Sequence, residues 1–178
     1  EVVWQLIRGV IYGPISPIYG FGAVLMILAL GRKKRPDWQT LLYGGLIGGG
    51  FEYIVSFLQE TFLGTISWDY TNELLNINGR TTIPFMIVWG LLAVVLVKIV
   101  YPTISSIVES LPEKFGKILT NILIVLLAID FAVSWGALIR QQLSHNGVPP
   151  FTVVGEFLDK YYPDEVLKES YTNMVIIE

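Results

Sequence analysis

The chain contains no cysteine and only one histidine, His145, among its 178 residues. The lack of thiols excludes disulfides, thiol catalysis and zinc–thiolate sites. A single histidine leaves no multi-histidine metal site, so we expect neither a metal nor another cofactor. The Walker A glycine–lysine loop is also missing, and any ATP hydrolysis would therefore need a separate subunit.

Charged residues are scarce as well. They make up 15% of the chain, whereas 53% of the residues are hydrophobic; a soluble domain is usually about 25% charged. The basic residues are too few for nucleic-acid binding. Runs of roughly 20 apolar residues are long enough to cross about 30 Å of hydrocarbon. The composition therefore predicts an all-α, polytopic transmembrane bundle whose surroundings are the lipid bilayer.

The apolar runs predict four spans, at residues 17–31, 38–64, 82–101 and 118–139. Residues 101–117 are expected to form a polar connector. Residues 1–11 fit either the end of a helix whose body lies upstream or a short amphipathic surface helix. With an upstream helix, the intact protein has about five crossings, four of them largely present here, in a single transmembrane domain over residues 1–178.

The orientation follows from the basic residues in short loops. The sequence "RKKR" at residues 32–35 marks a cytoplasmic loop, since lysine and arginine are retained on that side. The segment 65–81 and the polar tail 140–178 then lie outside the cytoplasm. We expect both to be ordered, as an extracytoplasmic cap and tail.

Glu52 lies well inside the second predicted span. An ionisable group near the bilayer centre costs several kcal/mol unless it faces protein or water. A helix places three further polar residues on the face of Glu52, and they form a stripe toward the outer loop: Ser56, Gln59 and Glu60. Either Glu52 makes a buried hydrogen bond that fixes helix packing, or it has a functional role.

Asp130 is a second acid in mid-span, with Ser134 one turn later on the same face. Two acids at similar depth could share a proton, hold a cation or pair with arginine. Pairing with arginine, for which Arg80 is a candidate, would keep the acids ionised. Without it, desolvation should keep them neutral.

The segment "SWDYTNELLNINGR", residues 67–80, is unusually polar for a link between two spans. Trp68 and Tyr70 suit the membrane interface, and Asn78-Gly79 is a strong turn signal. One interpretation is a hairpin-like cap; the other is a substrate-binding or structural polar site above Glu52, formed by Asp69, Asn76, Asn78 and Arg80. We expect a compact lid in which Arg80 reaches an acid, with Asp69, Glu52 or Glu1 as candidates.

Glycine and proline mark two more features. Gly44 with Gly48, and Gly45 with Gly49, give GxxxG spacings that permit close helix contact, with gating or self-association as the alternatives. The stretch "GPISPIYGFG" is not a regular helix throughout, because its prolines disrupt the hydrogen-bond ladder. It forms either a broken, re-entrant entry or a simple helix start with Pro17 in the first turn.

The succession of "GPISPIYGFGA", "FEY", "SWDYTNELLNINGR" and "IDFAVS" resembles the ABC-transporter type IV permease family, the CmpB-like bacterial membrane proteins. The resemblance covers nearly the whole chain and implies a multi-pass protein of the bacterial inner membrane. Residues at the family's pattern positions include Glu1, Tyr19, Glu52, Trp68, Asp69, Tyr70, Asn76, Asn78, Arg80, Trp89 and Asp130. A separate ATPase subunit is the partner that such a family implies.

We therefore expect a permease-like protein that handles a solute or ion at an outward-facing polar site. The alternatives are an accessory or sensor protein that binds a partner through its outer cap, and an outer-leaflet enzyme with Glu52 or Asp69 as acid/base. No catalytic constellation supports the enzyme. The residues expected to contribute to the polar site in addition are Glu1, Tyr19, Ser56, Trp68, Tyr70 and Ser134.

Overall fold

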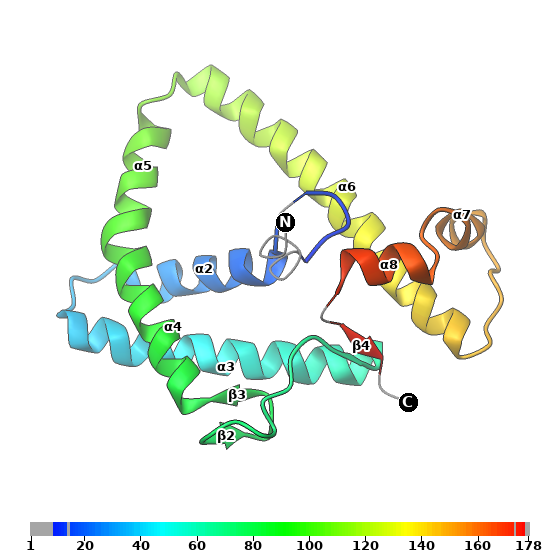
Figure 1. Cartoon of the computed structure of the whole chain (residues 1–178). Coiled ribbons are helices and arrows are strands. Elements are labelled where there is room, and N and C mark those ends of the chain that lie inside the picture. The colour runs from blue at the N-terminus through cyan, green and yellow to red at the C-terminus, as the bar shows by residue number, and fades with distance from the viewer. Residues whose placement is uncertain (1–8, 14, 173, 177–178) are drawn as a thin grey trace. The chain divides into compact units, whose positions relative to one another are not determined.

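The structure is a computed structural model that describes residues 9–13, 15–172 and 174–176 (Figure 1). The predicted all-α class is confirmed, because the described chain is dominated by helices with very short strands. The helices are α2 (Pro17–Leu30), α3 (Asp37–Leu63), α4 (Ile83–Val95), η1 (Leu96–Val100), α5 (Tyr101–Glu109), α6 (Glu113–His145), α7 (Val153–Tyr161) and α8 (Asp164–Ser170). The strands are β1 (Thr65–Ile66), β2 (Asn76–Ile77), β3 (Thr81–Thr82) and β4 (Val175–Ile176).

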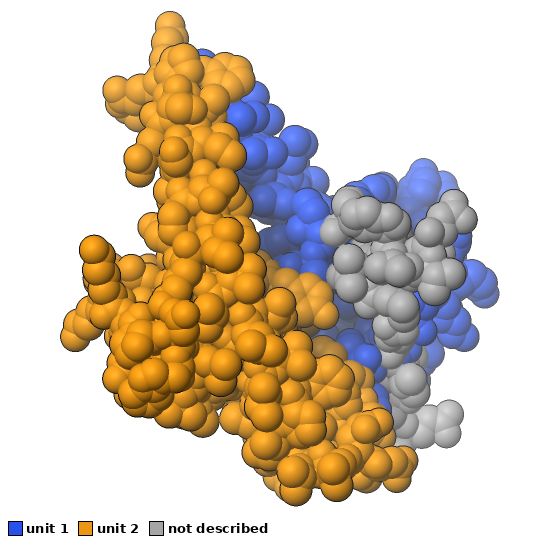
Figure 2. All heavy atoms as spheres, turned by 60° about the vertical axis from the view of Figure 1, so that its left-hand side comes forward, with its two compact units in different colours: residues 1–17, 59–67, 118–178 blue, residues 18–58, 68–117 orange. Residues whose placement is uncertain are grey.

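The chain divides into two compact units, which Figure 2 shows in different colours. Unit 1 comprises residues 1–17, 59–67 and 118–178, and unit 2 comprises residues 18–58 and 68–117. Each unit is described by itself below. The single domain expected over residues 1–178 stays a prediction.

In unit 2, helices α3 and α4 touch along the predicted glycine face of α3. A Cβ on Gly48 would lie 2.5 Å from Cβ of Trp89, and one on Gly45 would lie 2.6 Å from the Met86 carbonyl oxygen. From α4, a Cβ on Gly90 would lie 2.4 Å from the Leu41 carbonyl oxygen. Backbones approach this closely only where side chains are missing, so the packing interpretation of the glycines is confirmed.

The small apolar core of unit 2 lies beside that contact. Met26, Leu30 and Ala93 are buried there, with Trp89 packed against them. Helix α2 begins at Pro17, which therefore lies in the first turn as predicted, whereas a re-entrant course stays a prediction. Its 14 residues correspond to a length of about 21 Å, which is short for a bilayer crossing.

The predicted polar connector at residues 101–117 is wrong for most of its length. Helix α4 continues through η1 and α5 to Glu109, and α6 begins at Glu113. Pro102 lies in this stretch, and a proline usually ends or kinks a helix because it has no amide hydrogen and its ring crowds the preceding turn. The π-helical turn Leu96–Val100 lies just before it and widens the helix locally, which accommodates the proline without ending the helix.

In unit 1, helices α7 and α8 pack against the C-terminal part of α6. Ala137 of α6, Leu158 of α7 and Leu167 of α8 form the buried apolar cluster. Strands β1 and β4 pair antiparallel, with Thr65 opposite Ile176. Helix α6 extends to His145 and so continues past the predicted span end at residue 139 and the predicted tail start at residue 140.

Within the part of the chain that the structure describes, three helical stretches are long and apolar enough to cross a membrane: Asp37–Leu63, Ile83–Glu109 and Glu113–His145. Most of the apolar surface of the last two is not covered by protein, since 11% of the residues in the most apolar window of each are buried. Hydrocarbon is the medium in which such a surface is stable. Five crossings in the intact protein stay a prediction.

Candidate functional site around Glu52

Glu52 lies on α3 and is the only acid that is fully buried among the residues the structure describes, with 8% of its surface exposed. Three neutral donors bind its carboxylate. Thr81 Oγ1 donates to Oε2 at 2.7 Å, Trp89 Nε1 donates to the same oxygen at 3.3 Å, and Tyr70 OH donates to Oε1 at 3.3 Å. The bond from Thr81 is short, whereas the other two are at the long end of the usual range.

The three donors come from separate elements of unit 2. Thr81 belongs to β3, Trp89 to α4, and Tyr70 to the segment that precedes the hairpin. Glu52 therefore holds the segment between α3 and α4 against these two helices. If the segment moved away from the helices, the buried carboxylate would lose these hydrogen bonds and would be left desolvated at a cost in free energy. The three hydrogen bonds therefore stabilise the packing of the segment on the helices.

Aromatic rings lie next to two of the donors to the carboxylate, Tyr70 and Trp89. Tyr70 stacks on Phe85 with ring centroids 4.9 Å apart, and Tyr19 lies 6.0 Å from Trp89. Burial raises the pKa of the Tyr70 phenol well above its usual value, and the nearby charge of Glu52 raises it further. The phenol is therefore a hydrogen-bond donor at every physiological pH.

Arg80 lies next to this site and is held by other groups of unit 2. Its Nη1 donates to Ser56 Oγ at 3.3 Å, and its guanidinium carbon lies 5.8 Å and 5.4 Å from the ring centroids of Tyr53 and Phe57. These distances allow cation–π attraction. The expected ion pair of Arg80 with an acid stays a prediction, and Glu1 lies outside the described residues.

The segment 67–80 is ordered by its own polar side chains. Asp69 Oδ1 accepts from the Thr71 amide at 2.8 Å and from the Thr71 hydroxyl at 2.5 Å, and these bonds lower the pKa of Asp69. Asn76 donates to the carbonyl oxygens of Thr71 and Glu73 and accepts from the Gly79 amide. These contacts describe the cap that we expected.

The Asn-Gly turn joins β2 to β3. Asn78 and Gly79 have φ of 53° and 68°, and the Arg80 amide donates to the Ile77 carbonyl oxygen at 3.1 Å. Two successive left-handed residues are the requirement of a type I′ hairpin turn, which Asn-Gly meets at low cost. Asn78 also donates to Tyr53 OH at 2.9 Å, and Trp68 Nε1 donates to the Arg80 carbonyl oxygen at 2.9 Å. The predicted hairpin is therefore confirmed.

Asp130 and Ser134 belong to unit 1 and form a different kind of contact. Asp130 Oδ1 accepts from the Tyr12 amide at 3.3 Å and from Ser134 Oγ at 3.1 Å. Ser134 is fully buried and accepts from the Ile11 amide at 2.9 Å. The pair fixes the segment before α2 on helix α6. No contact between Asp130 and the Glu52 site is described, so a shared proton stays a prediction.

The end of α6 is held by a second polar cluster in unit 1. Arg140 is buried and donates to the Val148 carbonyl oxygen at 2.9 Å. Its Nε lies 2.7 Å from Asp159 Oδ1, which is an ion pair by distance although the N–H is not aligned for a hydrogen bond. Asp164 accepts from Gln141 and lies 2.8 Å from His145 Nε2.

Two of the residues that bind Glu52 were not predicted as site residues. Thr81 follows the polar segment, and no pattern in the sequence marks it as a partner of Glu52. A threonine just before a helix is usually interpreted as a helix N-cap. Trp89 was noted only as a family pattern position. A tryptophan on the glycine-facing side of a neighbouring helix is a signal that could have identified it, since its indole N–H needs a partner when buried.

The comparisons with known proteins define the family. A family model described as "Putative ABC-transporter type IV" matches residues 2–135, and the chain belongs to this family. The predicted resemblance is thereby confirmed. The family and the apolar helices together fit a membrane transport protein. Comparisons with curated proteins and with solved structures gave no match.

Proposed function

We propose that the protein is the membrane subunit of a transporter and that Glu52 is the site at which a cation or a cationic solute binds. The observation that carries the proposal is a buried carboxylate, on a helix that can cross a membrane, whose described donors are all neutral. A bound cation would keep this acid ionised, and an ionised carboxylate in such surroundings gains more from a counter-ion than it would in water.

The surrounding rings favour the same class of ligand. Trp89 and Tyr70 bring aromatic rings to the acid and Tyr19 lies beside Trp89, and aromatic rings attract ammonium and guanidinium groups. The long bonds from Tyr70 and Trp89 are the ones a ligand would replace, because each costs less to break than the short bond from Thr81. Thr81 would then keep the carboxylate in place.

The proposed transport needs an energy source that this chain does not supply by itself. The family points to an ABC-type ATPase as a separate subunit, and we propose that such a subunit completes the transporter. The permease role, the bacterial inner membrane and the multi-pass orientation belong to the same proposal.

The test measures cation-induced stabilisation of the full chain in detergent. The panel contains sodium, potassium, ammonium, tetramethylammonium and guanidinium, each compared at equal ionic strength. We expect at least one cation to raise the unfolding midpoint of the wild type, and Glu52→Gln to remove this rise. Glu73→Gln is the matched control, since Glu73 is an exposed acid of the same unit. A rise that persists in Glu52→Gln contradicts the proposal.

A partner-binding role is the second candidate function. Leu74 and Leu75 are 76% and 60% exposed at the hairpin, and Leu75 has a φ of 54°, which a leucine adopts only under strain. Exposed leucines held in a strained turn fit a surface that contacts an apolar partner. Stoichiometric copurification of another protein with the wild type, lost in Leu74→Ser, would favour this role.

A further inference from the structure

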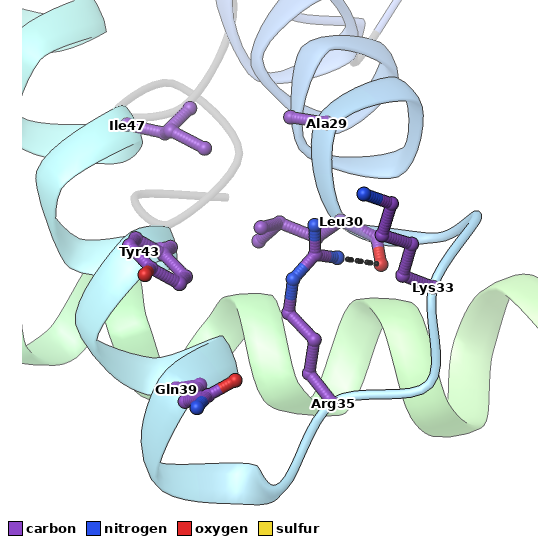
Figure 3. A pocket seen from close by; sticks show the side chains of 7 residues that line it. All are labelled: Ala29, Leu30, Lys33, Arg35, Gln39, Tyr43 and Ile47. Carbon is purple, nitrogen blue, oxygen red and sulfur yellow. Dashed lines mark hydrogen bonds between the residues drawn. The ribbon is translucent and has the colours of Figure 1, made fainter.

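An open pocket of about 400 Å³ lies in unit 2 between the end of α2 and the start of α3 (Figure 3). Its basic and polar lining residues lie toward the loop that joins the helices, and the apolar ones lie along the helix walls. The lining consists of Ala29, Leu30, Lys33, Arg35, Gln39, Tyr43 and Ile47. The pocket is separate from the residues that contact Glu52.

Two cations line the mouth of the pocket. The Arg35 side chain reaches from the loop into the space between α2 and α3, and its Nη1 donates to the Leu30 carbonyl oxygen at 2.9 Å (Figure 3). This bond uses one of five guanidinium N–H groups, so others are available for an anion. Lys33 is exposed at the same mouth and forms no ion pair among those described.

The nearby acid is already neutralised. Asp37, the first residue of α3, forms an ion pair with Lys98, and the Lys98 ammonium also donates to the Arg35 carbonyl oxygen at 3.0 Å. Lys33 and Arg35 therefore give the pocket a positive charge. A positive pocket favours an anion, and a guanidinium fork is well matched to phosphate oxygens.

The apolar wall distinguishes a lipid from a free anion. Ala29, Leu30 and Ile47 continue from the basic mouth along helices α2 and α3. Tyr43 lies between the two zones, and Trp38, 64% exposed at the start of α3, suits the membrane interface. A phospholipid matches both zones, because its phosphate lies at the interface, next to the basic mouth, and its acyl chains lie along the apolar helix walls.

We infer that this pocket binds the phosphate of an anionic phospholipid in the leaflet next to the loop 31–36. Lys33 and Arg35 contact the phosphate, Gln39 and Tyr43 offer hydrogen bonds to the headgroup, and the apolar wall holds the first part of one acyl chain. The inference does not depend on a transport role for Glu52.

The test titrates the purified full chain in detergent with dioleoylphosphatidylglycerol or dioleoylphosphatidylcholine and counts bound lipid by native mass spectrometry. We expect one anionic lipid to bind preferentially. Since a basic residue near the lipid contributes about 1 kcal/mol, Lys33→Gln should weaken its binding about fivefold. Lys34→Gln makes the same charge change on a neighbouring exposed residue outside the pocket and should have little effect. Equal losses in the two variants would show diffuse surface attraction and overturn the inference.

Two further experiments distinguish binding of a lipid from binding of a free phosphate. Glycerol 3-phosphate, which carries the phosphate without acyl chains, should not displace the lipid at equal concentration; full displacement would overturn the assignment. Ala29→Phe should fill the apolar wall and lower lipid binding, because Ala29 is exposed and lines the pocket. Leu28→Phe, on an exposed neighbour outside the pocket, is its control, and equal binding in the two variants contradicts the inference.

Discussion

Glu52 in unit 2 and Asp130 in unit 1 are acids in helices that are apolar enough to cross a membrane, yet their contacts differ. Glu52 accepts from three side chains on separate elements. Asp130 accepts from a backbone amide and from a serine on its own helix. A backbone amide cannot turn away, whereas a tyrosine or tryptophan can rotate. The comparison fits the proposed roles, in which Asp130 is a fixed structural contact and Glu52 an exchangeable one.

The largest expected effect is the loss of the Glu52 carboxylate. Glu52→Ala leaves the Thr81 hydroxyl and the Trp89 indole without their acceptor in a buried site, so we expect a loss of about 3 kcal/mol in unfolding free energy. Glu52→Gln keeps one carbonyl acceptor and should lose clearly less. Thermal unfolding in detergent measures both. Equal midpoints for the wild type and Glu52→Ala would show that the three contacts contribute nothing.

A second change alters the Glu52 site through packing alone. Gly48→Ala places a Cβ 2.5 Å from Trp89 Cβ and must push the indole away, at a cost of about 1–3 kcal/mol. Gly50→Ala on the same helix is the control, because a Cβ there meets nothing within 4 Å. The control should be neutral or gain up to about 1 kcal/mol from helix propensity. A similar destabilisation of both variants would contradict the described helix contact.

Removing the Ser134 hydroxyl should act on unit 1 without touching the Glu52 site. Ser134→Ala leaves the Ile11 amide without its described acceptor, and we expect a loss of about 1–2 kcal/mol. Hydrogen exchange of the Ile11 and Tyr12 amides should accelerate. Ser144→Ala, an exposed serine of the same helix, should change neither quantity. Unchanged exchange in Ser134→Ala would remove the structural role given to this pair.

Arg80 variants test whether the guanidinium plane matters beyond its charge. Arg80→Ala loses the contacts with Ser56, Tyr53 and Phe57, and we expect it to cost about 1 kcal/mol. Arg80→Lys keeps the charge but not the planar stacking, so it should recover only part of the lost stability. Unfolding midpoints of the three proteins measure this, and three coinciding midpoints would make Arg80 dispensable.

The smallest effect concerns pH and the end of α6. The hydrogen bond from Gln141, followed by that from His145, lowers the pKa of Asp164. A lowered pKa contributes stability at neutral pH that is lost as the pH falls through the lowered value. The variant Asp164→Asn should therefore have a lower unfolding free energy than the wild type at pH 6, and this difference should shrink as the pH falls to about 3. The difference stays under about 1 kcal/mol because the carboxyl group is partly exposed. Glu165→Gln, with no described contact at this cluster, should show no such trend.

The sequence predicted the helical class and the buried acid Glu52 for clear physical reasons. A charge within an apolar run, paired glycines and an Asn-Gly turn are local signals, and each predicted the element found. The partners of Glu52 could not be predicted in this way. Thr81 and Trp89 lie 29 and 37 residues from Glu52, and their approach depends on how closely α3 and α4 pack.

The continuation of the helix beyond Pro102 could not be predicted from the sequence either. A proline predicts a helix boundary only when the chain has no other means to accommodate its ring. The π-helical turn at Leu96–Val100 accommodates the ring of Pro102. Its residues do not differ in sequence from those of an ordinary apolar helix. In the segment 67–80, the sequence left open whether the polar side chains form a cap or a polar site, and which of them reach Glu52 depends on the folded turn.

The most direct test of the account follows Trp89 by fluorine NMR. All five tryptophans are replaced by 5-fluorotryptophan, and the Trp89 resonance is assigned with Trp89→Phe. Because the indole donates to Glu52, a bound cation should displace it and shift this resonance. We expect the shift in the wild type and in Asp130→Asn, and none in Glu52→Gln. A shift that persists in Glu52→Gln, or is lost in Asp130→Asn, would contradict the exchangeable role of Glu52.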